Sequence, residues 1–94
     1  MNKHTATNPA DGMEYTRNSA TRIYAYCVVS VFNHRDGSKS QDVSWTSRMD
    51  LAQKIASKNV GAIERLQNSP FPDVADAYQG ANAETLILEA VLKP

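Results

Sequence analysis

The stretch RIYAYCVVSVF, residues 22–32, decides the fold class of this chain. Its β-branched and aromatic residues are typical of a strand. A strand with one face in water alternates apolar and polar residues, whereas this stretch is apolar at nearly every position. Alternation places Ile23, Ala25, Cys27, Val29 and Val31 on one face and Tyr24, Tyr26, Val28, Ser30 and Phe32 on the other. Both faces therefore need cover, and we expect a helix over the first of them.

A turn and a second strand follow this stretch. Asp-Gly at residues 36–37 is a strong hairpin signal, and residues 40–46 alternate apolar and polar side chains. A three-residue loop with a left-handed Gly37 sets Val29 opposite Val43, whereas a two-residue turn moves the apolar side chains of the second strand to the tyrosine face. We favour the three-residue loop because it collects the apolar side chains of both strands on one face.

Residues 48–67 have the periodicity of one amphipathic helix. Its apolar side chains fall within an arc of about 140°. Ser47 with Asp50 three residues later resembles a capping box at its start. Gly61 falls on the polar side, where a glycine costs roughly 1 kcal/mol and need not end the helix. We favour one long helix over the alternative, a helix that ends near Asn59 and is followed by a strand.

The C-terminal part is predicted to hold a short helix and a strand. Prolines at 70 and 72 interrupt the chain, and residues 73–78 fit a short helix with Gly80 just beyond its end. The segment TLILEAVL, residues 85–92, is apolar enough for a strand or a helix. We favour a strand, since a two-stranded hairpin is marginal without a third strand.

The first twenty residues differ from the rest of the chain. Residues 1–20 are rich in Asn, Thr, Ala, Pro and Gly without a sustained apolar period, so we expect a flexible N-terminal arm. Met13 and Tyr15 are the side chains of the arm that we expect to dock. Residues 21–94 then make a single α+β domain with a thin core. It contains a small antiparallel sheet, with elements in the order β-β-α-α-β, and one long amphipathic helix packed on one face.

Composition and motifs favour neither an enzyme nor a membrane protein. The net charge is zero, and there is no secretory signal and no apolar run of about eighteen residues, so we expect a location in the cytoplasm of a host cell. Cys27 lies within the strand pattern and is assigned to the core. His4 in the arm and His34 at the hairpin tip have no partner that would hold them as a base. Asp73 and Asp76 have no third metal ligand. We therefore predict no catalytic residue, no cofactor and no metal.

Two sets of side chains are candidates for binding. Tyr24, Tyr26 and Phe32 alternate on one strand face, and aromatic rings on a sheet face serve protein interfaces, self-association and single-stranded nucleic acids alike. The third reading is that the arm or the short helix covers this face within the monomer. The second set is basic, lies at the hairpin tip and along the long helix, and suits an acidic partner or a phosphate backbone. Its members are Arg35, Lys39, Arg48, Lys54, Lys58 and Arg65.

The order RIYAYCVVSVF, RDG, DVSW, DLAQKIASKNVGAIERL and TLILEAVL, across residues 22–92, resembles small phage and prophage accessory proteins of strand-strand-helix-strand build. Some proteins of that kind are anti-CRISPR inhibitors. The resemblance implies a phage or mobile-element origin and a host protein or nucleoprotein complex as the partner, inhibited by occlusion. It carries no signature residue and therefore transfers no site. The alternative function is a small dimeric nucleic-acid-binding accessory protein, and a homodimer is compatible with either reading.

Overall fold

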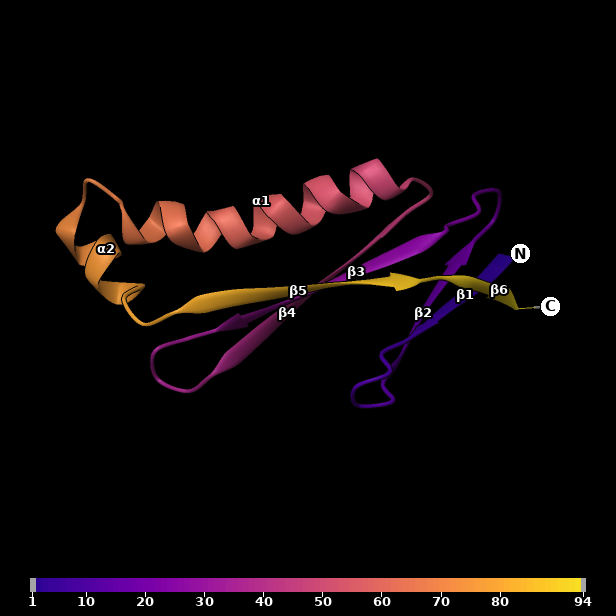
Figure 1. The fold of residues 1–94 in the computed structure, drawn as a ribbon, viewed down its shortest axis with the longest axis horizontal. Helices are drawn as coiled ribbons and strands as arrows, with labels where there is room; N and C mark the ends of the chain where they lie inside the picture. The colour runs from indigo at the N-terminus through magenta and orange to yellow at the C-terminus, as the bar shows by residue number, and fades with distance from the viewer. Residues whose placement is uncertain (1, 94) are drawn as a thin grey trace.

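The computed structural model describes residues 2–93, which form six strands and two helices in an elongated molecule of 51 × 25 × 19 Å (Figure 1). In chain order the elements are β1 (Asn2–Thr7), β2 (Glu14–Ser19), β3 (Tyr26–Asn33), β4 (Lys39–Thr46), α1 (Met49–Gln67), α2 (Pro72–Ala77), β5 (Asn82–Glu89) and β6 (Val91–Lys93). The α+β class is thus confirmed.

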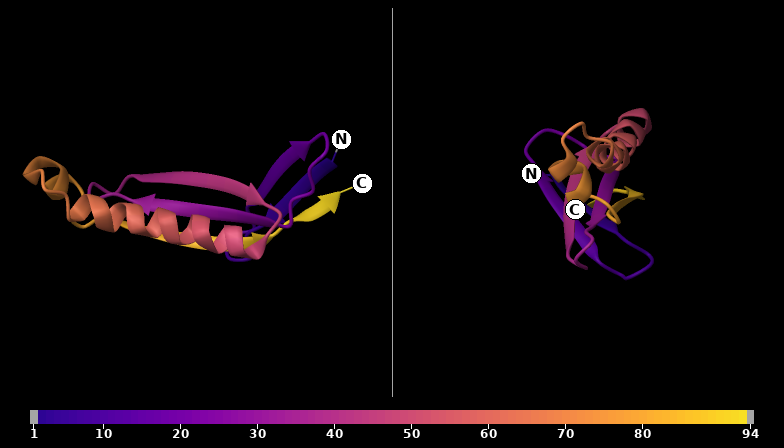
Figure 2. Two further views of the ribbon diagram at one scale, coloured as in Figure 1. Left: turned by 90° about the horizontal axis from the view of Figure 1, so that it is seen from above. Right: turned by 90° about the vertical axis from the view of Figure 1, so that its left-hand side faces the viewer.

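The strands form two antiparallel sheets rather than the single sheet that was predicted. One has the order β4-β3-β5 and the other the order β2-β1-β6. Figure 2 shows the second sheet at the end of the molecule opposite α2. The C-terminal segment belongs to both sheets, because β5 pairs with β3 and β6 pairs with β1, with Ala90 between them. The backbone N–H of Ala90 donates to the carbonyl of Ala25 at 2.8 Å, which ties this bend to the start of β3.

The β3–β4 hairpin has the predicted register. Val29 lies opposite Val43 and Cys27 opposite Trp45, and Gly37 closes the loop with a φ of 89°. A side chain at such a φ is strained, so glycine sets this turn. The strand itself is shorter than predicted: β3 begins at Tyr26, and residues 20–25 are a connection that leads into it.

The long helix covers the other face of the central sheet than the one predicted, which was the face of Cys27. The helix α1 packs on the face that carries Val28 and Ser30, where Asn59 Nδ2 donates a 2.7 Å hydrogen bond to Ser30 Oγ. The opposite face, with Cys27, packs against Ala6 of β1 in the main apolar cluster. Because both faces of β3 are apolar, alternation alone does not say which layer covers which face.

The expected flexible arm over residues 1–20 is also corrected, since residues 2–19 contain the β1–β2 hairpin. Asn and Asp, which are also common in disordered segments, form the hydrogen bonds that shape its loop. Asn8 accepts from the backbone N–H of Ala10 at 2.9 Å, and Asp11 from that of Met13 at 2.9 Å. Tyr15 docks against the apolar cluster as predicted, whereas Met13 stays 53% exposed.

His4 fixes this hairpin to the central sheet. Its side chain is fully buried, and its Nε2 accepts a 3.0 Å hydrogen bond from the backbone N–H of Tyr24. Nδ1 lies 3.3 Å from the carbonyl oxygen of Arg17. Because Nε2 accepts, Nδ1 must carry the proton and donate to that carbonyl. A residue assigned to a mobile arm is therefore part of the core.

The helices agree with the sequence except at one cap. The helix α1 continues through Gly61 as a single helix, and α2 begins with a proline. The predicted capping box is absent: the N-cap residue is Arg48, and no side chain caps the helix. Arg48 instead binds Asp50, with Nε 3.0 Å from Oδ1. The segment 85–92 is extended, as favoured, and β5 starts three residues earlier. No helix among residues 2–93 is long and apolar enough to span a membrane.

Candidate protein-binding surface

The three aromatic residues that were predicted to share one strand face lie in different surroundings. Tyr26 and Phe32 are half-buried on the sheet face that α1 covers. Tyr24 precedes β3, and its ring packs edge-on against His4 with centroids 5.1 Å apart. The centroid of the Trp45 ring is 6.2 Å from that of Tyr24. The structure therefore joins Tyr24 to Trp45 and separates it from the other two rings.

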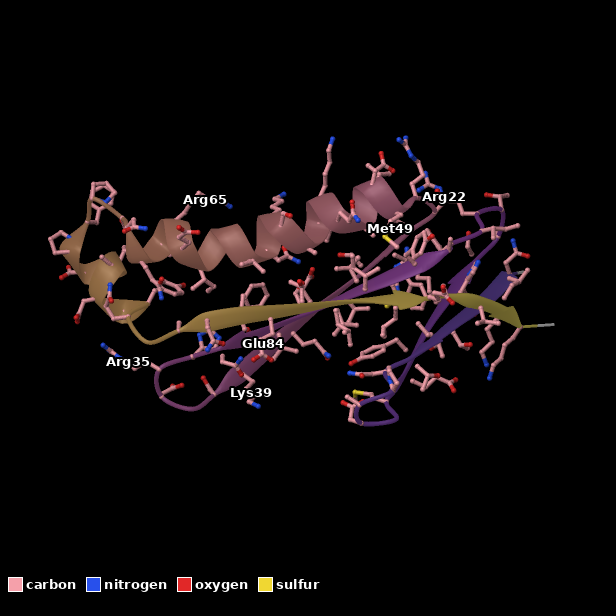
Figure 3. All side chains as sticks on the ribbon, viewed as in Figure 1. Arg22, Arg35, Lys39, Met49, Arg65 and Glu84 are labelled. Carbon is pink, nitrogen blue, oxygen red and sulfur yellow. The ribbon has the colours of Figure 1, made fainter. Side chains whose placement is uncertain are left out.

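The six predicted basic residues are all exposed and are spread along the molecule. Figure 3 shows Arg35 and Lys39 at the end near α2, far from Arg22. Arg35 Nη1 donates to the carbonyl of Asp76 at 3.0 Å and so ties the hairpin tip to α2. Arg48 is held in its ion pair with Asp50. The other members lie along α1, and they are Lys54, Lys58 and Arg65.

A pocket of about 370 Å³ opens where the connection 20–25, the end of β4 and the start of α1 meet. We call its apolar side chains and the arginine at its edge the junction patch, which comprises Arg22, Ile23, Tyr24, Trp45 and Leu51. The Ile23 side chain is 61% exposed and that of Leu51 38%. Polar atoms of Thr46 and Ser47 complete the lining.

The connection that forms one wall of this pocket is held in place by its backbone. The N–H of Arg22 donates to Ser19 Oγ at 2.8 Å, and the carbonyl of Arg22 accepts from Asn2 Nδ2 at 3.3 Å. The N–H of Ala25 donates to the carbonyl of Thr46 at 3.0 Å. These bonds on both sides of Ile23 present its side chain to solvent from a fixed backbone.

A second arginine lies beside the patch. The guanidinium carbon of Arg17 lies 5.9 Å from the centre of the Tyr24 ring, within the range of a cation–π contact. Between residues 2 and 93 the ion pairs are Arg48–Asp50 and Lys93–Glu14. Arg17 and Arg22 thus have no carboxylate partner within the described chain, and both are exposed.

A second hollow of about 380 Å³ lies under the β1–β2 loop, on the sheet face opposite α1. Its floor includes Val31 and Leu86, its roof includes Met13, and Asp11 and Glu84 line its edge. This groove is more apolar than the junction pocket and has acidic rather than basic side chains at its border.

The nucleophilic and metal-ligating side chains form no reactive cluster in the described part of the chain. Burial raises the pKa of the Cys27 thiol to about 11, so the thiol stays protonated at neutral pH. His34 Nε2 lies 3.1 Å from Ser40 Oγ on the exposed hairpin. Over residues 2–93, no three His, Cys, Asp or Glu side chains are grouped to hold a metal ion.

Comparison with known proteins gives no match for this chain among protein-family models, curated sequences or solved structures. The chemistry of its own surface is therefore what bears on function.

Ile23, Trp45, Leu51, Arg17 and Arg22 were not among the predicted site residues. Two signals for them are present in the sequence. Leu51 lies at the margin of the apolar arc of α1, where a helix residue is only partly covered. Trp45 is the single tryptophan and is the last residue but one of a strand that precedes a helix start. Ile23 looked like a strand residue, and only the late start of β3 exposes it.

Proposed function

We propose that this protein is a non-enzymatic protein-binding module that attaches to its partner through the junction patch. The observation that carries the proposal is the exposure of Ile23 and Leu51 beside Tyr24 and Trp45. Apolar side chains grouped around a pocket and bordered by arginine have the composition of a binding hot spot, in which Trp, Tyr and Arg are enriched. A surface that is already ordered loses less conformational entropy when it binds a partner. Hydrogen bonds order the backbone on both sides of Ile23 in this way.

The mode of action that we propose is occlusion. A small elongated body of 51 × 25 × 19 Å blocks a site on a larger complex without chemistry of its own. The resemblance to phage accessory proteins supports a host protein or nucleoprotein complex as the target, with a defence complex of the anti-CRISPR kind as the most concrete case. A phage or mobile-element origin belongs to the same proposal.

Affinity capture from a bacterial host lysate tests this function. We expect a variant with Ile23→Asp and Leu51→Asp to lose the partner that the wild type retains, because both apolar contacts are removed. The matched control is Phe71→Asp, which changes a side chain that is 68% exposed and lies between α1 and α2. Far-ultraviolet circular dichroism establishes that each variant is folded. Equal recovery of the same partner by the wild type and the patch variant rules the patch out.

A second candidate function, nucleic-acid binding, is favoured by one observation on α1. Lys54, Lys58 and Arg65 lie within about 40° of each other around the helix, and none of the three forms an ion pair with a described residue. A basic stripe of this kind suits a phosphate backbone. It is short for such a role, and the net charge of the chain is zero, so we rank this function second.

A further inference from the structure

We infer that the junction patch binds an acidic segment of its partner, in which one aromatic or large aliphatic side chain enters the pocket between Tyr24, Trp45 and Leu51 while neighbouring carboxylates pair with Arg17 and Arg22. The inference rests on the proposed function and names the chemistry of the partner that the same surface accepts.

The charge around the pocket that has no partner within the described chain is positive. Arg17 and Arg22 are exposed and have no carboxylate partner among residues 2–93. Asp50, the acidic side chain nearest to Leu51 in sequence, is already engaged by Arg48. A partner surface that brings lysine or arginine here meets two free guanidinium groups, whereas one that brings carboxylates satisfies them.

The guanidinium groups suit carboxylates in geometry as well as in charge. Arginine presents a planar set of donors that binds a carboxylate through two parallel hydrogen bonds. Arg17 is placed by its contact with the Tyr24 ring at 5.9 Å. The backbone of Arg22 is held by Ser19 and Asn2. The Arg17 guanidinium and the Arg22 backbone therefore need little ordering when an acidic segment arrives.

The pocket has room for one anchor side chain. Its volume of about 370 Å³ is near the lower end of ligand pockets, which span roughly 300–1,000 Å³. Tyr24 and Trp45 line it, and the centroids of their rings are 6.2 Å apart with an interplanar angle of 52°. Aromatic rings prefer tilted or edge-on neighbours, so a ring from the partner completes this group. Leu51 from α1 supplies the aliphatic wall.

The groove under the β1–β2 loop provides a comparison that distinguishes charge-dependent binding from non-specific hydrophobic binding. The groove under the β1–β2 loop is bordered by Asp11 and Glu84. An acidic segment is repelled there and attracted at the junction patch, although the two hollows are of similar size. Binding of an acidic segment must therefore depend on the arginines of the patch.

Fluorescence of Trp45, the single tryptophan of the chain, provides a direct test. The probes are three short synthetic peptides: a Phe flanked by glutamates, the same peptide with lysines in place of the glutamates, and the glutamate peptide with Ala in place of Phe. We expect the Glu-Phe peptide to change the emission saturably and to bind at least about tenfold more tightly than either of the others. Its affinity should fall as salt is added, because the paired charges are exposed.

A charge reversal identifies the residues that are responsible. In a variant with Arg17→Glu and Arg22→Glu, the preference should invert, so that the Lys-Phe peptide binds more tightly than the Glu-Phe peptide. The matched control, Lys58→Glu with Arg65→Glu, makes the same change of charge on the outer face of α1 and should leave the affinity within about twofold. Should the double patch variant fail to fold, because Arg17 contacts Tyr24, the single Arg22→Glu change carries the test.

Three outcomes overturn the inference. They are equal binding of the glutamate and lysine peptides, an unchanged preference in the charge-reversed variant, and no emission change with any peptide up to about 1 mM. Each of these leaves the capture experiment with Ile23→Asp and Leu51→Asp to decide separately whether the patch binds a partner at all. If the capture variant loses the partner but the peptides show no charge preference, the proposed function is retained and the acidic segment is rejected.

Discussion

His4 joins the N-terminal hairpin to the connection before β3 through one hydrogen bond and one aromatic contact, both with Tyr24, while its second hydrogen bond is to Arg17 within the hairpin. A buried polar side chain of this kind stabilises a fold only while both of its partners are in place, since each unpaired group then costs about 1–3 kcal/mol. His4 also supports the proposed binding surface, because its Nε2 accepts a hydrogen bond from the backbone N–H of Tyr24, a residue of the junction patch.

Replacing His4 by Phe tests this role. The ring volume is nearly kept, but the N–H of Tyr24 and the carbonyl of Arg17 lose their partner, so we expect the free energy of unfolding to fall by about 2–4 kcal/mol in urea denaturation. The matched control is His34→Phe on the exposed hairpin, where the change should be below about 1 kcal/mol. Equal losses for the two variants contradict the role assigned to His4.

Cys27 makes the stability of the protein depend on pH in alkaline solution. Burial raises its pKa from 9.0 to about 11, so between these values the unfolded chain releases the thiol proton while the folded protein keeps it. The folded state then loses stability as the pH rises from about 9 to 11, and the full contribution is present below pH 9.

Comparison with Cys27→Ala isolates this effect from other groups that titrate in the same range. We expect the difference in unfolding free energy between the wild type and Cys27→Ala to shrink as the pH is raised over that interval. Urea denaturation at a series of pH values measures it. In the same way, a thiol reagent should modify native Cys27 far more slowly than Cys27 in the unfolded chain at neutral pH. A constant difference across the interval would show that the thiol is not shielded.

At the scale of single elements, the sequence predicts the turns, strands and helices that are encoded by residues close together in the chain. The Asp-Gly turn with a left-handed Gly37 determines the β3–β4 register, and the arc of apolar residues on 48–67 determines α1. The layer that covers each face of β3 is not a local property. It depends on small groups such as Ser30, which leaves room for Asn59 to approach.

The β1–β2 hairpin was missed because its strands contain few of the residues that mark a strand. The sequences NKHTAT and EYTRNS are largely polar, and only Ala6 and Tyr15 reach the apolar cluster. Polar strands form here because β6 and the central sheet supply partners from the distant end of the chain. The junction patch was also missed, since it exists only where the connection 20–25, the end of β4 and the start of α1 meet.

The basic stripe on α1 separates the two candidate functions. If the protein bound nucleic acid through it, Lys54→Glu with Lys58→Glu would abolish binding, and the affinity of the wild type would fall steeply with salt. We expect instead that neither single- nor double-stranded probes bind measurably at low salt, and that the double variant still captures its protein partner. Fluorescence anisotropy with labelled oligonucleotides measures the first point. Salt-sensitive binding that this variant loses would favour the second function.

At the scale of the whole molecule, two sheets share one C-terminal segment. The β2-β1-β6 sheet receives its third strand from residues 91–93, whose side chains are exposed, so β6 contributes mainly through backbone pairing. On its own, a two-stranded hairpin such as β1–β2 is at best marginally stable in water. The placement of His4, and with it the wall of the junction patch, therefore depends on a strand that adds little apolar contact.

A chain that ends at Ala90 tests this dependence. We expect the backbone amides of residues 2–19 to exchange with deuterium faster, while those of β3 stay protected by β4 and β5. The matched control, Val91→Ala with Leu92→Ala, keeps the backbone of β6 and should keep the protection. Loss of protection in both variants would mean that the two side chains, rather than the backbone pairing, hold the hairpin.

The shared C-terminal segment also sets the order of events during synthesis. The hairpins of residues 2–19 and 26–46 leave the ribosome first, yet each is only a pair of strands. Neither sheet is complete until residues 82–93 have emerged, because the same segment closes both. During synthesis, both hairpins therefore lack their third strand until this segment emerges. A messenger that is truncated within residues 82–93 yields a product that lacks the third strand of at least one sheet.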